Sequence, residues 1–310
     1  MYYRSITDLN HLILSKIDRI PADTQLIVGI PRSGMVPAII MAQSLHLPYT
    51  DLHSFIAGKM YTSSHESTII DPETYGNIVL VDDSVASGNA ITKARAQLSG
   101  VDSRFNIQFC TIYIVPTKLK MVDIYFEILA LPQIFQWNMF HHSVLEKACF
   151  DIDGVLCNDP SLEQDDDGPL YLDFLENAPS LYIPGCKIGT IVTSRLEKYR
   201  PQTEAWLNKH HIRYQQLVMY NPGNNKKSEQ ENPAALKASI YKSMHYFLFI
   251  ESSLYQAQKI NQLTGKPVLC TENFEMITDS ESILHNIRSG KYFPGVREIL
   301  LNIRRRIKGS

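Results

Sequence analysis

Short apolar runs alternate with helical patterns of hydrophobic residues along the whole chain. The runs lie at 26–30, 78–81, 107–115, 148–152, 188–193, 246–250 and 267–270. Runs of this length suit single strands, and continuous apolar runs are typical of strands that helices cover on both faces. The alternation therefore predicts an α/β protein with parallel or mostly parallel sheets flanked by helices.

The length of the chain allows two such domains. It has 310 residues, which is enough for two domains that each bury a core of their own. In both halves, apolar runs are followed by loops whose polar residues could bind a substrate or react with it. We therefore expect one α/β domain over 1–142 and a second over 143–310.

Composition and charge exclude several classes of protein. Thirty Lys and Arg against 32 Asp and Glu give a net charge of −2, which indicates no nucleic-acid partner. No apolar stretch is long enough for a membrane span and the first residues lack a signal peptide pattern, which predicts a cytoplasmic protein. The five cysteines are odd in number and lack C-x-x-C spacing, so we expect reduced thiols.

Two adjacent carboxylates and a loop of small residues follow the run at 78–81. Asp82 and Asp83 come first, then the loop 84–89, then a helical pattern over 90–98. Ligands of open α/β sheets bind beyond the carboxyl ends of the strands. A small-residue loop that leads into a helix binds anions through its N–H groups, while carboxylates accept hydrogen bonds from hydroxyls. The pattern predicts a sugar-phosphate site.

A second loop of this kind is "VGIPRSGMVPA" at 28–38. Pro31, Ser33 and Gly34 favour a tight turn, and Arg32 offers a planar bidentate donor to a phosphate. The alternative is an ordinary strand-to-helix turn with a surface arginine. Taken together, the two loops indicate a substrate with phosphates at both ends and hydroxyls between them.

The stretch "VLVDDSVASGNAI" resembles the phosphoribosyl pyrophosphate (PRPP) motif of the type I phosphoribosyltransferases, and "GIPRSG" resembles their pyrophosphate loop. The resemblance covers about residues 20–135. It implies that Asp82 and Asp83 hold the ribose hydroxyls and that Arg32 contacts the pyrophosphate with Mg²⁺. In the family's mobile loop, which we place at 57–76, we choose Lys59 as the pyrophosphate contact. The remaining residues expected to bind PRPP are Ser33, Gly34, Ser84, Val85, Ala86, Ser87, Gly88 and Asn89.

Three strand ends in the second half carry polar residues suited to phosphate chemistry. In "ACFDIDGVLC", Asp151 and Asp153 could act as a nucleophile and a proton donor. "IGTIVTSR" ends in hydroxyls, with Thr193 and Ser194, and "YFLFIESS" carries Glu251, an oxygen ligand that suits Mg²⁺. The alternative for the first stretch is a strand followed by an acidic turn.

These three stretches resemble the haloacid dehalogenase superfamily of phosphatases over about residues 147–290. The resemblance implies that Asp151 is the nucleophile, Asp153 the general acid and base, and Thr193 a phosphate ligand. It also implies a Mg²⁺ site formed by Asp151, Asp153 and Glu251. The family requires a lysine, for which Lys226, Lys227 and Lys237 compete. We choose Lys237 because its helical pattern directly precedes the strand that ends in Glu251.

Two further segments stand out. The apolar segment 123–142 ends in Trp137, Asn138, His141 and His142, and we expect it to form the last strand of the first domain and its junction to the second. A metal site at the two histidines is the alternative. The stretch 296–310 is expected to form a basic amphipathic helix, a candidate contact with the inner face of the membrane.

The whole chain, including "YRSITDLN" and "LPYTDLHSFIAGK", resembles the fusions that make ribofuranose for bacterial glycans. This resemblance implies transfer of 5-phosphoribose to a glycan acceptor, for which a lipid-linked glycan is a candidate, followed by removal of the 5-phosphate. The segment 156–192 is too short for an enclosing lid, which agrees with a bulky substrate. A nucleobase acceptor and a PRPP sensor without turnover are the alternatives, and the oligomeric state stays open.

Overall fold

The computed structural model describes residues 1–61, 66–67, 71, 73–101, 103–165, 167–221 and 233–278. The chain divides into two compact units, Met1–Met139 and Phe140–Ser310. Each unit contains a largely parallel sheet flanked by helices. This confirms the predicted α/β fold class.

The sheet of the N-terminal unit has the strand order β5-β4-β3-β2-β6-β7-β8. Neighbouring strands from β3 to β8 pair in parallel, whereas β4 and β5 form an antiparallel edge. A separate parallel pair joins the two ends of the unit, because β1 pairs with β9. The strands are β1 (Tyr2–Arg4), β2 (Leu26–Gly29), β3 (Tyr49–Asp51), β4 (Met60–Tyr61), β5 (Glu66–Ser67), β6 (Asn77–Val85), β7 (Asn106–Ile114), β8 (Ile124–Ile128) and β9 (Gln133–Phe135).

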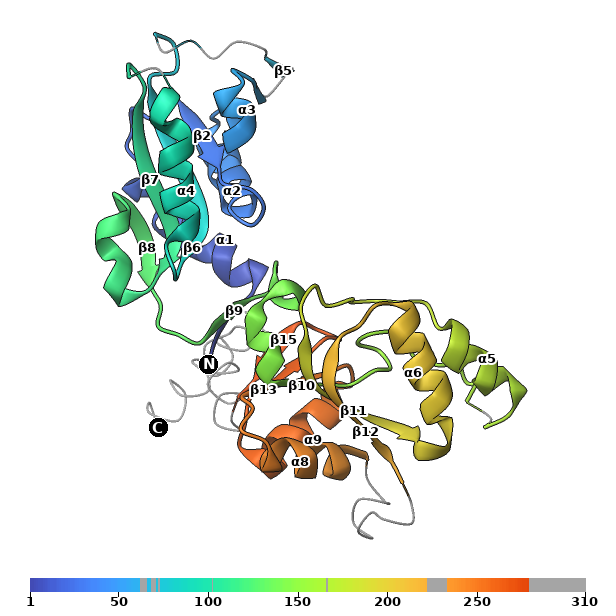
Figure 1. The fold of residues 1–310 in the computed structure, drawn as a ribbon. Coiled ribbons are helices and arrows are strands. Elements are labelled where there is room, and N and C mark those ends of the chain that lie inside the picture. Colours follow the sequence, from blue (N-terminus) through green and yellow to red (C-terminus); the bar gives the residue numbers. More distant parts are fainter. Residues whose placement is uncertain are drawn as a thin grey trace, which may run out of the picture. The chain divides into compact units, whose positions relative to one another are not determined.

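Helices cover both faces of the central strand β6 (Figure 1). Val79 and Val81 of this strand pack in one cluster with α1 and α2, while Ile78 and Leu80 pack in the other with α3 and α4. This period of two is expected of a strand buried on both sides. The helices are α1 (Ile6–Ser15), α2 (Met35–Leu45), α3 (Leu52–Ile56) and α4 (Asn89–Gln97), with short 3₁₀ turns at Ile17–Arg19, Leu98–Gly100 and Pro116–Met121.

The sheet of the C-terminal unit has the order β12-β11-β10-β13-β14-β15. Its strands pair in parallel except for β15, which is antiparallel to β14. The order places β10 between β11 and β13, so the carboxyl ends of these three strands meet at one edge. The strands are β10 (Ala148–Phe150), β11 (Ile188–Leu196), β12 (Tyr214–Tyr220), β13 (Leu248–Glu251), β14 (Val268–Cys270) and β15 (Glu275–Ile277).

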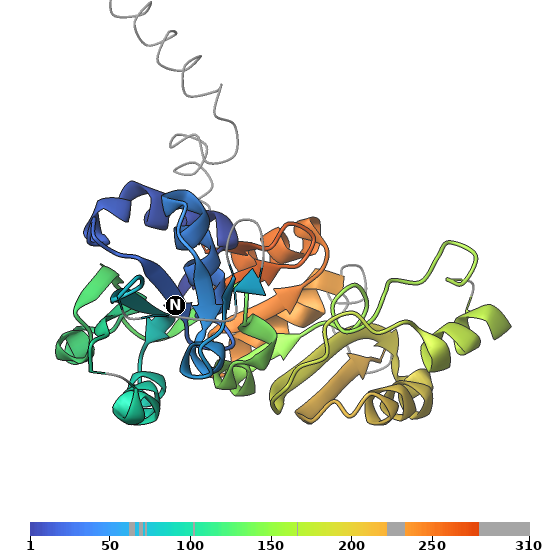
Figure 2. The same ribbon diagram turned by 90° about the horizontal axis from the view of Figure 1, so that it is seen from above.

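Helices also flank this second sheet. The orange helices α8 and α9 lie on one side of it and the yellow helix α6 on the other (Figure 1). Figure 2 shows the strands of the unit from a second direction. Apolar side chains of α8 and α9, among them Tyr241 and Ile260, pack in one cluster with β10, β13 and β14. The helices are α5 (Pro169–Asn177), α6 (Arg200–Lys209), α8 (Pro233–Ser243) and α9 (Leu254–Thr264), with 3₁₀ turns at Met139–His141, Ser143–Lys147 and Glu197–Tyr199.

Two strand boundaries differ from the prediction in ways that affect the sites. β11 continues past residue 193 to Leu196, so Thr193 and Ser194 lie inside the strand. β6 continues through Asp82 and Asp83 to Val85 instead of ending at residue 81, so the acid pair lies inside the strand. Backbone pairing continues because Asp82 and Ser84 lie opposite Thr111 and Tyr113 of β7. Within the described residues, none of the helices combines the length and the apolar character that a membrane crossing requires.

Candidate functional site

The N-terminal unit buries the acid pair of β6. Asp82 and Asp83 are only 5% and 3% exposed. Burial, followed by the charge of Asp83, raises the pKa of Asp82 to about 8. Burial also raises the pKa of Asp83, although hydrogen bonds from Trp137 and Ser33 oppose the rise. Two adjacent carboxylates in such a place cannot both carry a full charge without a partner, which makes them suited to binding hydroxyls or a cation.

Asp83 receives hydrogen bonds from two distant parts of the unit. Ser33 Oγ donates to Oδ1 at 3.0 Å, and Trp137 Nε1 donates to Oδ2 at 2.6 Å. Asn138 Nδ2 adds a longer contact to Oδ2 at 3.4 Å. The Asp83 backbone N–H donates to Asp82 Oδ1 at 3.0 Å. The acid pair is therefore held in place from the loop before α2 and from the segment after β9.

The loop 31–34 passes very close to β6. A Cβ atom at Gly34 would lie 2.6 Å from the Ile30 carbonyl oxygen and 2.7 Å from the Val81 carbonyl oxygen, so only glycine fits here. The loop brings Ser33 to the acid pair, while the Arg32 side chain is exposed. An exposed guanidinium in a loop that contacts the acid pair through Ser33 is available to an anionic substrate.

The second expected phosphate loop, 84–89, leads into α4. Gly88 has a φ of +87°, a conformation that favours glycine, and α4 begins at Asn89. Ser84 and Ala86 are half-buried, Ser87 and Asn89 are exposed, and Val85 is buried in the apolar cluster with Ile91. Lys59 lies just before β4 with an exposed side chain, and its role stays a prediction. Most of the expected mobile loop between Lys59 and residue 73, including His65, lies outside the described residues.

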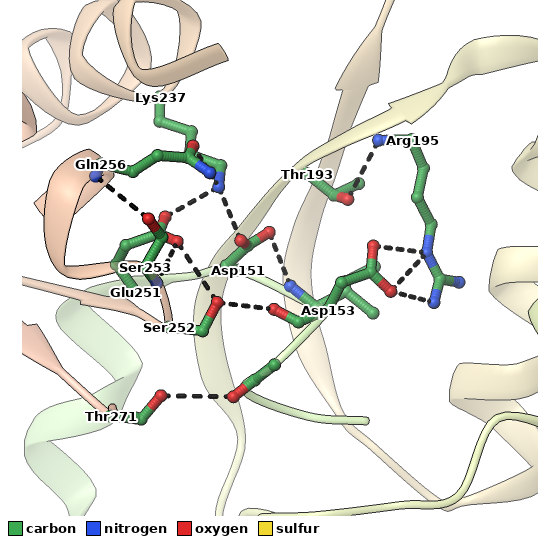
Figure 3. A network of polar contacts seen from close by, with 12 residues as sticks. Asp151, Asp153, Thr193, Arg195, Lys237, Glu251, Ser252, Ser253, Gln256 and Thr271 are labelled. Atoms are coloured by element: carbon green, nitrogen blue, oxygen red, sulfur yellow. Dashed lines mark hydrogen bonds and ion pairs between the residues drawn. The ribbon is translucent and has the colours of Figure 1, made fainter. Parts of the chain in front are cut away.

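In the C-terminal unit, three neighbouring strands bring their polar ends together. Asp151 directly follows β10, Thr193 lies near the end of β11, and Glu251 is the last residue of β13. All three residues are buried, at 5%, 0% and 0% exposure. Because the strands are parallel and adjacent, residues far apart in the sequence meet at one edge of the sheet, as Figure 3 shows.

Lys237 of α8 bridges two of these carboxylates (Figure 3). Its Nζ lies 2.6 Å from Asp151 Oδ2 and 2.7 Å from Glu251 Oε2, and it donates to Gln256 Oε1 at 3.0 Å. Burial raises the pKa of Asp151 to about 8, although the Lys237 charge acts in the opposite direction. Burial lowers the pKa of Lys237, but the two carboxylates outweigh it and raise the value above its ordinary range. Lys226 and Lys227, the competing lysines, lie outside the described residues.

A second cation, Arg195, holds Asp153. Its Nη2 lies 2.6 Å from Asp153 Oδ1, and its Nε donates to both carboxylate oxygens at 3.1 and 3.2 Å. Arg195 is only 2% exposed and also contacts the Cys157 sulfur at 3.3 Å. Arg195 was not among the predicted site residues, although it directly follows Thr193 and Ser194 in the sequence. A basic residue at that position was the available signal.

Hydroxyl and backbone contacts complete the network. Thr193 Oγ1 accepts from the Arg195 backbone N–H at 3.2 Å, and Ser252 Oγ donates to the Asp153 carbonyl at 3.1 Å. Thr271 Oγ1 donates to the Gly154 carbonyl at 3.2 Å (Figure 3). The neighbouring Ser194 lines a cavity, whereas the Thr193 side chain is fully buried.

The cavity has a volume of about 690 Å³ and opens above this network. Asp151, Asp153, Arg195 and Lys237 lie in its wall. The other lining residues are the aromatic Tyr171 and Tyr182, the acidic Asp159, Asp165 and Glu272, and Gly154, Pro160, Leu181, Ser194, Pro233, Ser252, Ser253, Gln256 and Thr271. The volume lies in the range of sites for small organic ligands and exceeds what a phosphate group requires.

The carboxylates have the oxygen donors that Mg²⁺ prefers. Within the described part of the chain, however, no three His, Cys, Asp or Glu side chains are grouped so that they could hold a metal. Mg²⁺ is commonly bound by one or two carboxylates together with substrate phosphates, so a Mg²⁺ site at Asp151, Asp153 and Glu251 stays a prediction. His142 has a structural contact instead, since its Nδ1 accepts from the Val144 backbone N–H at 3.2 Å.

Comparison with known families identifies the first part of the chain. Residues 2–147 match the family described as "Phosphoribosyl transferase domain". The N-terminal unit is a phosphoribosyltransferase domain. This confirms the predicted resemblance of the first half, while the phosphatase resemblance of the second half stays a prediction. A comparison with curated proteins gave no match.

Solved structures similar to the chain cover the same part of it. A purine phosphoribosyltransferase from Pyrococcus horikoshii is 16% identical, with 44% of this chain and 92% of that chain covered and a TM-score of 0.34. A xanthine-guanine-hypoxanthine phosphoribosyltransferase from Helicobacter pylori is 16% identical, with 44% and 91% covered and a TM-score of 0.34. A hypothetical protein from Neisseria gonorrhoeae with bound ppGpp is 12% identical, with 44% and 88% covered and a TM-score of 0.32. Similarity at this level says nothing about the acceptor of this phosphoribosyltransferase domain.

Proposed function

We propose that the chain catalyses two consecutive reactions. The phosphoribosyltransferase domain transfers 5-phosphoribose from PRPP to a glycan acceptor, and the C-terminal unit then removes the 5-phosphate to leave ribofuranose. The observation that carries this proposal is the buried bridge of Lys237 between Asp151 and Glu251 at the wall of a large cavity. A carboxylate next to a buried ammonium group is a suitable nucleophile for a phosphate monoester.

In the first reaction, a hydroxyl oxygen of the acceptor attacks C1 of the ribose and the C1–O bond to pyrophosphate breaks. The hydroxyl proton passes to the released pyrophosphate or to water. Asp82 and Asp83 hold the ribose hydroxyls, the loop 84–89 holds the 5-phosphate, and Arg32 contacts the leaving pyrophosphate. The protein acts mainly by orienting the two substrates and by stabilising charge on the leaving group. Mg²⁺, when bound with the substrate, would add to the neutralisation of that charge.

In the second reaction, an oxygen of Asp151 attacks phosphorus and the ribose C5 oxygen leaves. Asp153, in its protonated form, gives its proton to that oxygen, which produces the free hydroxyl of the sugar. Asp153 then takes a proton from water, whose oxygen attacks the phosphorus, breaks the Asp151–phosphate bond and releases inorganic phosphate. Lys237 and Arg195 keep positive charge beside the reacting carboxylates, and a Mg²⁺ ion held by Asp151, Asp153 and Glu251 would add to it.

The cavity wall supports a neutral, hydroxyl-rich carrier of the phosphate. Asp159, Asp165 and Glu272 are exposed carboxylates that line the same cavity. Carboxylates accept hydrogen bonds from sugar hydroxyls and repel additional phosphates. Tyr171 and Tyr182 are half-buried rings in the same wall, and such rings offer an apolar surface with a polar tip. These features favour a glycan over a nucleotide with several phosphates.

An acceptor screen tests the proposal. Purified protein receives PRPP and Mg²⁺ with either oligosaccharides or nucleobases, and pyrophosphate release is measured. We expect release with an oligosaccharide, and an Asp82→Asn/Asp83→Asn variant serves as the inactive control. Turnover with a base and with no sugar would replace the glycan assignment by nucleobase chemistry. PRPP binding without any pyrophosphate release would favour a sensor.

A lipid-linked acceptor and contact with the inner face of the membrane belong to the same proposal. They depend on the basic stretch 296–310, which lies outside the described residues. Sedimentation of the full chain with anionic vesicles, compared with neutral ones, tests this contact. Binding to both kinds of vesicle or to neither would contradict it.

A further inference from the structure

The segment after β9 contributes two side chains to the acid pair of β6. Trp137 Nε1 lies 2.6 Å from Asp83 Oδ2, and Asn138 Nδ2 lies 3.4 Å from the same oxygen. Trp137 is 54 positions away from Asp83 in the sequence. Phosphoribosyl transfer as proposed assigns no role to this segment.

Packing fixes the orientation of the Trp137 indole. Its ring stacks on Phe135 with centroids 4.8 Å apart and an angle of 12° between the planes. Phe135 in turn stacks on Tyr113 of β7 at 5.0 Å, and its backbone lies opposite Arg4 in the β1–β9 pair. The indole N–H is therefore directed by a stack of rings and a strand pairing before any substrate binds.

The two carboxylates of the pair differ in what holds them. Asp83 accepts from Ser33 on one oxygen and from Trp137 on the other, so both of its oxygens are fixed. Asp82 Oδ1 accepts from the backbone N–H of Asp83. A buried carboxylate that keeps its charge requires such donors, and hydrogen bonds to a charged group are among the stronger ones in proteins.

We propose that Trp137 is a positioning residue for phosphoribosyl transfer, which holds the Asp83 carboxylate in the orientation that receives the ribose hydroxyls of PRPP. The indole N–H can donate and cannot accept, so Trp137 orients a charge and exchanges no proton with the substrate. This inference rests on the proposed role of the acid pair in PRPP binding. The inference adds a contribution from the end of the domain, where β9 pairs with β1.

Loss of the indole N–H changes the proton affinity of the acid pair. The groups that hydrogen-bond to Asp83 are Asp82, Ser33, Trp137, Asn138 and the backbone N–H of Ser84, and the titratable Tyr113 of β7 also interacts with its charge. Because the hydrogen bond from Trp137 lowers the pKa of Asp83, its removal raises that pKa. The acidic limb of the pH profile of kcat/KM should then move to higher pH.

The substitution Trp137→Phe tests the inference, because phenylalanine keeps the stacked ring and lacks the N–H. We expect the KM for PRPP to rise about tenfold, in line with the loss of a hydrogen bond to a charged group. Trp206→Phe is a matched control. Its indole is fully buried in the C-terminal unit and donates to the Ala178 carbonyl at 2.9 Å. This control should leave the KM for PRPP and the pH profile unchanged.

A second measurement uses the wild-type chain, so it does not depend on whether a variant folds. The chain contains two tryptophans, so ¹⁵N-tryptophan labelling gives two indole N–H signals. Addition of PRPP should shift the Trp137 signal and leave the Trp206 signal in place. An unchanged KM and pH profile in Trp137→Phe, or a Trp137 signal that PRPP does not move, would overturn the inference. Wild-type protein that binds no PRPP would instead contradict the proposed function.

Discussion

Removal of the Lys237 ammonium group should destabilise the C-terminal unit and abolish its phosphatase activity. The substitution Lys237→Met keeps the length of the side chain and removes the charge that lies 2.6 Å from Asp151 and 2.7 Å from Glu251. Asp151 is 5% exposed and Glu251 is fully buried, so water solvates these two carboxylates poorly once the ammonium group is lost. Removing one member of a buried ion pair costs roughly 3–5 kcal/mol of unfolding free energy.

The loss of activity follows from the same contacts. Lys237 opposes the effect of burial on the pKa of Asp151, which is about 8 with the lysine in place. Without the ammonium group the pKa of this carboxyl rises further, and the protonated acid cannot attack phosphorus. Loss of the positive charge also removes stabilisation of the transition state. We expect phosphate release to fall about 10²- to 10³-fold, the usual effect of removing one such group.

The assay combines phosphate release from ribose 5-phosphate with thermal unfolding. Lys242→Met is the matched control, because Lys242 lies on the same helix with an exposed side chain and should change neither quantity. The double variant Lys237→Met/Glu251→Gln removes one of the two uncompensated carboxylates. It should recover a large part of the stability and none of the activity. Near wild-type phosphate release by Lys237→Met would refute the reasoning.

Further predictions concern both units. Asp82→Asn should stop pyrophosphate release and leave phosphatase activity intact, and equal loss of both activities would contradict separate sites. Burial raises the folded-state pKa of Asp82 from 3.8 to about 8, so the stability that this group contributes is lost as pH rises through this window. Between pH 5 and 9, the unfolding temperature of the N-terminal unit should therefore fall more in the wild type than in Asp82→Asn. Gly34→Ala places a Cβ 2.6 Å from the Ile30 carbonyl oxygen and should lower the stability of the N-terminal unit by roughly 1–3 kcal/mol, as calorimetry can show. Arg195→Met leaves Asp153 without its ion pair and should reduce phosphate release, while a rate equal to wild type would show that this pair is dispensable.

The sequence alone predicts the apolar centre of each sheet well. The runs that became β6, β7 and β11 are continuous because helices cover both faces of these strands. β12 escaped prediction because it lies at a sheet edge and carries exposed Gln215 and Gln216, which interrupt the apolar pattern.

The polar residues of the site were harder to predict, because distant parts of the chain decide their environment. Strand β6 continues through Asp82 and Asp83 since buried carboxylates there receive donors from Ser33 and Trp137, 50 and 54 positions away. Arg195 is buried because its guanidinium pairs with Asp153, 42 positions away. These contacts join residues too far apart in the sequence for a local pattern to indicate them.

The central claim is that one chain installs a phosphoribosyl group and then removes its phosphate. Mass spectrometry of the acceptor after reaction with PRPP and Mg²⁺ tests it most directly, with wild-type protein compared with Asp151→Asn. Because an amide cannot attack phosphorus, the variant should leave phosphoribose on the oligosaccharide, whereas the wild type leaves ribose and releases phosphate. Plain ribosyl product from Asp151→Asn at the wild-type rate would contradict the claim.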